Sequence, residues 1–300
     1  MRPVMSKTLT ANPVLGALAR QEIGNYLRHK LFWVSAAIWA LACFVALANP
    51  SEGSSTTGDG IFLGFGFGVL GIVTMAGLVR NSDRAAAVSG AVAVPQRIRT
   101  LALAATVVVP GVLALVWFVF AAISFHVNPP AAAVGPFGDH SATDFLAGIF
   151  AEGVVPSIGG PLLGLLIARW LPRRGVAEVF SVLVVVTTMV LQPLFTWAEI
   201  PRLAWVWIHF YAPGGIPGDP DRLLAYPGSP YLYICYQLTL CLLGVLVAMY
   251  RDPEADHAAL KRKVFAVLGL AAVLVVLTYA VGPHEMEPSN VPSSNAGEAR

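Results

Sequence analysis

The sequence predicts an all-α membrane protein: a bundle of about seven transmembrane helices preceded by an amphipathic helix at the membrane interface. Hydrophobic residues make up 56% of the 300 residues and charged residues only 12%, whereas soluble domains are roughly 25% charged. In addition, the apolar residues gather in segments long enough to cross a bilayer, and the basic residues gather in alternate loops. The formal net charge of +2 gives no indication of a nucleic-acid partner.

The transmembrane domain is expected over residues 31–281, after a cytoplasmic segment at 1–30 and before a disordered extracytoplasmic tail at 282–300. A helix of about 18–25 apolar residues crosses about 30 Å of hydrocarbon. Each span must be helical because lipid offers the backbone no hydrogen-bond partners. The expected spans are 31–48, 61–79, 101–125, 145–168, 176–197, 231–250 and 264–281.

The distribution of Lys and Arg predicts the orientation of the bundle. Sixteen of the 19 Lys and Arg residues lie before the first span or after the second, fourth and sixth spans. Because basic loops stay in the cytoplasm, we expect a multi-pass protein of the plasma membrane with its N-terminus in the cytoplasm and its C-terminus outside. On the outer side, the aromatic segment 203–211 is too short to span, so it is expected to lie in the interface or re-enter it.

Residues 14–30 are expected to form an amphipathic helix on the cytoplasmic surface. Apolar residues recur at helical spacing, and polar residues occupy the opposite face. The apolar residues are Leu15, Leu18, Ala19, Ile23, Tyr26 and Leu27, and the polar ones are Arg20, Gln21, Asn25 and Arg28. Glu22 falls in the middle of the apolar stripe.

The sequence carries no motif that predicts an enzyme. The glycine-rich phosphate-binding motif that ends in Gly-Lys-Ser or Gly-Lys-Thr is absent, so the chain itself is not expected to bind ATP. Residues 66–71 match G-x-G-x-x-G but lie inside a predicted span, with no strand before them. The six histidines form no H-x-x-x-H pair. We therefore expect no catalytic residues, no metal and no cofactor.

Glycines recur at an interval of four residues in two of the predicted spans. Gly60, Gly64 and Gly68 share one helix face, and Gly160 and Gly164 repeat the spacing. Small residues at this interval let helix backbones approach closely in lipid. We interpret them as packing positions, within the bundle or between two copies.

The fourth predicted span contains an acid and two prolines. Each proline frees a backbone carbonyl one turn earlier, which predicts a break in the helix. An interrupted helix with an acid can line a substrate or ion path. The candidate path residues are Glu152, Pro156, Gly159, Gly160 and Pro161. The alternative is that the helix starts late and Glu152 lies at the outer interface.

The basic segment at 80–99 also has two interpretations. Ser82 or Asp83 can cap a short alanine-rich helix, which Pro95 ends before the third span. The segment is either an ordinary cytoplasmic loop or a docking surface for a cytoplasmic partner. The candidate docking residues are Asp83, Arg84, Pro95, Gln96 and Arg97.

This layout resembles the type-2 permeases of ATP-binding-cassette (ABC) exporters over about residues 14–250. The amphipathic helix with Glu22 resembles their elbow helix, and the segment that contains Val94-Pro95-Gln96-Arg97 resembles their coupling region. The segment 203–211 resembles their outer re-entrant helices. Such permeases usually have six spans with both ends inside, whereas the segment 264–281 adds a seventh.

The resemblance implies a membrane subunit that exports a substrate with ATP hydrolysed by a separate subunit. The implied partners are an ABC ATPase, a second copy or a similar permease, and the lipid bilayer, with no nucleic acid. ATP-driven closure would reach the membrane through residues 80–99. Two other functions stay open: a proton- or ion-coupled carrier that uses Glu152, and a non-transporting membrane scaffold or assembly protein.

Overall fold

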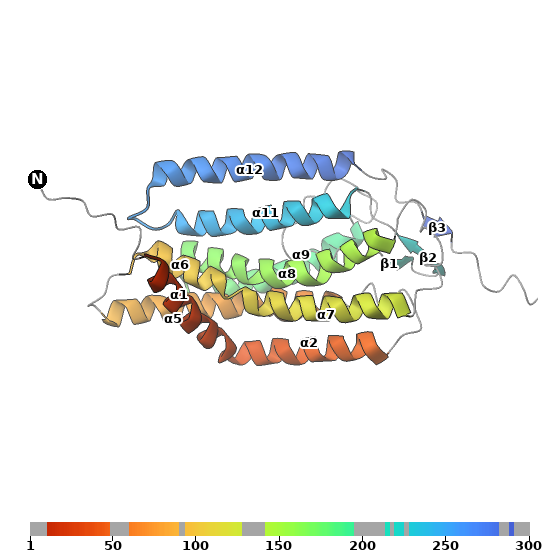
Figure 1. Cartoon of the computed structure of the whole chain (residues 1–300), viewed down its shortest axis with the longest axis horizontal. Coiled ribbons are helices and arrows are strands. Elements are labelled where there is room, and N and C mark those ends of the chain that lie inside the picture. The colour runs from red at the N-terminus through yellow and green to blue at the C-terminus, as the bar shows by residue number, and fades with distance from the viewer. Residues whose placement is uncertain are drawn as a thin grey trace, which may run out of the picture.

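The computed structural model describes residues 11–48, 60–89, 94–127, 142–194, 214–216, 219–224, 228–281 and 288–290. In these ranges, long helices run side by side in the membrane-type all-α bundle that the sequence predicts (Figure 1). The helices are α1 (Ala11–Leu27), α2 (Lys30–Ala48), α4 (Gly60–Leu63), the π-helix η1 (Gly64–Val69), α5 (Leu70–Ser89), α6 (Gln96–Ala105), α7 (Val108–Val127), α8 (Ala142–Trp170), α9 (Val176–Leu194), α11 (Pro230–Met249) and α12 (His257–Ala280).

Every predicted span falls on a helix of this bundle. Within the described residues, five helical stretches are long and apolar enough to cross a membrane, and six are if the bent pair α1–α2 counts as one span. The remaining predicted span, 176–197, corresponds to α9, which has a shorter apolar stretch at Val176–Thr187. The five stretches are Gly60–Val88, Gln96–Val127, Leu146–Trp170, Pro230–Met249 and His257–Ala280.

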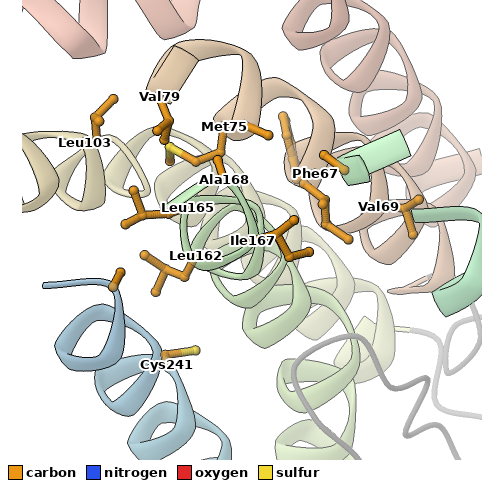
Figure 2. Close-up of a cluster of buried hydrophobic side chains, with 14 of the residues drawn as sticks. Phe67, Val69, Met75, Val79, Leu103, Leu162, Leu165, Ile167, Ala168 and Cys241 are labelled. Carbon is orange, nitrogen blue, oxygen red and sulfur yellow. The ribbon is translucent and has the colours of Figure 1, made fainter. Parts of the chain in front are cut away.

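Helix α8 lies at the centre of the bundle, and α12 lies at its edge. α8 packs against α5, α7 and α11, whereas α12 packs mainly against α11. The core around α8 is shown in Figure 2 and includes Phe67, Val69, Met75, Val79, Leu103, Leu162, Leu165, Ile167, Ala168 and Cys241. The large apolar side chains of α12, such as Phe265 and Val276, are exposed, as expected for a surface that faces lipid.

Glycines bring α8 against η1 and α5 at the level of the backbone. A Cβ atom on Gly160 would clash with the carbonyl oxygen of Gly68, and a Cβ atom on Gly164 would clash with that of Ile72. The packing interpretation of this glycine spacing is therefore confirmed within the bundle. In the same region, Ser35 Oγ on α2 donates a hydrogen bond of 2.8 Å to Gly66 O in the π-helix.

The prediction of a separate short helix after residue 80 is wrong. α5 runs without interruption from Leu70 to Ser89, so Ser82 and Asp83 lie inside a helix and cap nothing. Residues 80–89 contain no Gly or Pro that would stop the helix, and Asp83 has partners on other helices. Pro95 does mark a boundary, because it is the residue before the first turn of α6.

Three short strands form an antiparallel sheet at the end of the bundle opposite α1 (Figure 1). They are β1 (Gly214–Ile216), β2 (Asp219–Leu224) and β3 (Pro288–Asn290), in the order β1-β2-β3. The sequence did not predict them. The expected interfacial segment 203–211 lies outside the described residues, as does the tail beyond Asn290.

Candidate functional site

The basic segments come together at one end of the bundle (Figure 1). This basic end is formed by α1, the last turns of α5, the first turn of α6, the end of α8 and the loop between α11 and α12. The described Lys and Arg residues there are Arg20, Arg28, Lys30, Arg80, Arg84, Arg97, Arg99, Arg169, Arg173, Arg174, Arg251, Lys261, Arg262 and Lys263. That this end faces the cytoplasm stays a prediction from the charge distribution.

Helix α1 is amphipathic and lies across the basic end. It meets α2 at a bend of 70° and packs against α5 and α6. Tyr26 is buried, and burial raises the pKa of its hydroxyl, while Arg20, Gln21, Asn25 and Arg28 on the polar face are exposed. The predicted amphipathic helix is therefore confirmed, except that Leu27 belongs to the exposed side.

Glu22 is buried in the apolar stripe of α1, with 6% of its surface exposed. Asn25 Nδ2 donates a hydrogen bond of 3.1 Å to its Oε2 atom. In the part of the chain that the structure describes, none of the three salt bridges involves Glu22. A buried carboxylate without a cation is costly.

A pocket of about 1010 Å³ lies between α1, the end of α5 and the start of α6. Its polar lining includes Glu22, Asn25, Arg28, Asp83, Gln96 and Arg99. His29 also lines it, and burial lowers the pKa of the imidazole, which is therefore neutral at pH 7. The elbow-like helix and the predicted docking segment thus share one pocket.

Asp83 joins three helices beside this pocket. Its carboxylate accepts hydrogen bonds from Arg169 Nη1 on α8, at 2.8 Å and 2.9 Å, and from Arg99 Nη1 on α6, at 2.9 Å. Only 2% of the Arg169 side chain is exposed. Among the described residues, Arg169 Nε and Nη2 and Arg99 Nε have no hydrogen-bond partner. One carboxylate facing two guanidinium groups leaves the cluster positive.

Asp252 makes a second connection at the basic end. This residue is 1% exposed and lies in the loop between α11 and α12. Its Oδ2 accepts a hydrogen bond of 2.8 Å from the backbone N–H of Arg97, and its Oδ1 accepts one of 3.0 Å from that of Glu254. The start of α6 is thereby attached to the loop before the seventh predicted span. The sequence analysis predicted neither Asp252 nor Arg169 as a site residue.

The predicted docking residues divide into two groups. Asp83 and Gln96 line the pocket, whereas the side chains of Arg84 and Arg97 are exposed. Pro95 precedes α6 and is partly buried. The structure therefore places two basic side chains on the surface next to a pocket in which Asp83 and Arg99 form a salt bridge.

The prediction of a break in the helix at Pro156 and Pro161, among the candidate path residues, is wrong. α8 is continuous from Ala142 to Trp170, with Pro156 and Pro161 inside it. Proline is tolerated there because the neighbouring helices enclose α8, and Ser157 Oγ donates a hydrogen bond of 2.7 Å to Gly153 O nearby. The late start of the helix is also wrong, since Glu152 lies ten residues inside it and is 1% exposed.

The candidate path residues lie in a contact between helices. Pro156 lies against Gly68 and Pro161 against Gly71, while Gly160 meets the backbone of η1. Gly159 is buried in the same stretch. Glu152 lies where a Cβ atom on Gly60 would come within 2.9 Å of its carboxylate. None of these residues lines the pocket at the basic end.

Comparison of the chain with protein-family models, with curated proteins and with solved structures finds no match. In the described ranges, no group of three or more His, Cys, Asp and Glu residues could hold a metal ion. The helices are those of a multi-pass membrane protein by length and composition. A functional proposal therefore depends on the geometry of the basic end.

Proposed function

We propose that this chain is the membrane-spanning permease subunit of an ABC-type exporter, which moves its substrate with ATP hydrolysed by a separate subunit. The main support for this proposal is the position of α1. This amphipathic helix bends by 70° into α2, packs on α5 and α6 and buries the acid Glu22 at a shared pocket. An elbow helix beside a coupling segment is the arrangement that the resemblance implies.

The connections at the basic end support a coupling role. A push on the basic segment 80–99 would act on Asp83 in α5, which is bonded to α6 and α8. It would also act on Arg97, whose backbone is bonded to Asp252 in the loop between α11 and α12. These hydrogen bonds of 2.8–2.9 Å connect α5, α6, α8 and the loop between α11 and α12, so movement at this segment would be transmitted to each of them.

The proposed partner is an ABC ATPase that docks on the exposed side chains of Arg84 and Arg97. These side chains are free to meet acidic groups of a partner, and charge complementarity mainly sets the rate and specificity of docking. A second copy of this chain or a similar permease completes the proposed transporter. Under this proposal the chain has no catalytic activity of its own.

The docking proposal is tested by charge reversal in the full-length chain. Arg84→Glu and Arg97→Glu together are expected to reduce the ATPase subunit recovered with the chain by about tenfold, because the docking contacts become repulsive. The matched control reverses Arg173 and Arg174, which are exposed at the same end but belong to the loop between α8 and α9. Equal recovery with both double variants would contradict docking at Arg84 and Arg97.

One observation favours a second candidate, a proton- or ion-coupled carrier. Glu152 is an acid with 1% exposure inside the central helix of the bundle. Ionisable residues in this position are costly in a membrane and often serve a transport step. Transport that continues without ATP and without an ATPase subunit would favour the carrier over the permease.

A further inference from the structure

The pocket at the basic end is lined by charged residues of both signs, Glu22, Arg28, Asp83 and Arg99. On the α1 side, Glu22 is buried with an amide as its hydrogen-bond partner. On the α5–α6 side, Arg99 lines the pocket and shares Asp83 with Arg169. Arg169 does not line the pocket, and because both guanidinium groups face the single carboxylate of Asp83, the α5–α6 side carries an excess of positive charge. A ligand with a cationic group for Glu22 and an anionic group for Arg99 would complement both charges.

The depth of the pocket indicates where such a ligand comes from. Trp33 in the first turn of α2 is 65% exposed, and Trp170 at the end of α8 is 42% exposed. Exposed tryptophans beside a ring of Lys and Arg mark the level of lipid headgroups, and an amphipathic helix such as α1 lies at that level. Leu18 and Leu78 add apolar surface to the pocket lining. Phospholipids are the charged amphiphiles that are abundant at this depth.

We infer that this pocket binds the headgroup of a phospholipid from the leaflet at the basic end, with the phosphodiester at Arg99 and a headgroup ammonium at Glu22. Arg99 Nη1 is bonded to Asp83, so Nη2 is the donor that would meet a phosphate oxygen, and guanidinium groups bind phosphate well. Arg28 is exposed, also lines the pocket and adds positive charge to it. The lipid class is one that carries both charges, such as phosphatidylethanolamine. The inference requires that the chain spans a membrane and is independent of any ATPase partner.

Binding is measured on the detergent-purified full-length chain by native mass spectrometry. The four probes are short-chain phosphatidylethanolamine, short-chain phosphatidylglycerol, glycerophosphoethanolamine and inorganic phosphate. We expect one phosphatidylethanolamine per chain, bound about tenfold more tightly than phosphatidylglycerol because only the former has an ammonium for Glu22. The two soluble compounds are expected to bind more weakly than either lipid, because they lack acyl chains.

Two variants locate the site. Ala86 is exposed and lines the pocket, so Ala86→Trp fills it and should weaken phosphatidylethanolamine binding at least about tenfold. Val88→Trp is the matched control, because Val88 lies on the same helix, is 88% exposed and does not line the pocket. A third variant, Glu22→Gln, should remove the preference for phosphatidylethanolamine over phosphatidylglycerol. Melting curves identify any variant that fails to fold.

Several outcomes would overturn the inference. Equal binding by Ala86→Trp and Val88→Trp would place the lipid elsewhere. If Glu22→Gln still prefers phosphatidylethanolamine over phosphatidylglycerol, Glu22 does not bind the headgroup ammonium. Inorganic phosphate or glycerophosphoethanolamine binding as tightly as the lipid would identify a soluble phosphate compound as the ligand. Failure of the folded wild-type chain to bind either lipid would contradict the proposal outright.

Discussion

Arg169, in the last turn of α8, holds Asp83 of α5 through two hydrogen bonds from its Nη1 atom to the two carboxylate oxygens, at 2.8 Å and 2.9 Å. The Arg169 side chain is 2% exposed, whereas that of Asp83 is 44% exposed. The buried partner is therefore the cation. Loss of Asp83 would leave a buried guanidinium without a counter-charge, which costs far more than loss of a surface pair.

The first prediction concerns the stability of this ion pair. Asp83→Asn should lower the free energy of unfolding by about 3 kcal/mol, measured by thermal or denaturant unfolding in detergent. Glu178→Gln is the control, because Glu178 is 47% exposed and lies 3.6 Å from Arg80. Its removal should cost less than about 1 kcal/mol. Similar losses in the two variants would show that Asp83 does not stabilise the basic end.

The second prediction concerns the contact between α8 and α5. Gly164→Ala should destabilise the bundle by about 1–3 kcal/mol, because the new Cβ atom meets the backbone of Ile72 and the helices must separate. Gly269→Ala in α12 is the control, since a Cβ atom there has no neighbour within 4 Å. Alanine favours a helix over glycine by about 1 kcal/mol, so this variant should be neutral or more stable. The reverse order of stability would contradict the glycine contact.

The third prediction concerns Glu152 and the carrier alternative. If this carboxylate contacts cargo or a cation, Glu152→Gln should reduce transport by about tenfold, equivalent to about 1.4 kcal/mol, while the melting temperature stays near that of the wild type. If Glu152 only supports packing, the melting temperature should fall together with activity. Wild-type transport in the variant would remove Glu152 from the candidate path residues.

The fourth prediction concerns orientation. In a chain without its native cysteines, Gly90→Cys should react with a membrane-impermeant reagent only after the cells are opened. Asn290→Cys should react in intact cells, because the charge distribution places the two positions on opposite sides. Labelling of position 90 from outside, or protection of position 290, would contradict the predicted topology.

The spanning helices could be predicted because bilayer thickness sets their length and lipid excludes other backbone conformations. The buried acid of α1 could be predicted for a similar reason, since helical periodicity places Glu22 among Leu18 and Tyr26. Both predictions depend on neighbours in the sequence. They needed no knowledge of how the helices pack.

The connections at the basic end could not be predicted because they join distant parts of the chain. Asp83 is 86 residues from Arg169, and Arg97 is 155 residues from Asp252. The local pattern around Asp83 is equally typical of a helix cap, and only the tertiary contact decides between the two. The prolines of α8 are a similar case, since a helix enclosed by neighbours can continue through residues that would break an isolated one.

We propose that this chain works with a separate ATPase, and purification from the native membrane tests that proposal. The tagged full-length chain is extracted in mild detergent, its bound proteins are identified by mass spectrometry, and ATP hydrolysis by the purified material is measured. We expect a stoichiometric ABC ATPase to purify with the chain and to hydrolyse ATP. Both the bound ATPase and the hydrolysis should decrease in the Arg84→Glu, Arg97→Glu variant and persist in the Arg173→Glu, Arg174→Glu control. A folded chain that purifies without any ATP-hydrolysing subunit would contradict the proposal.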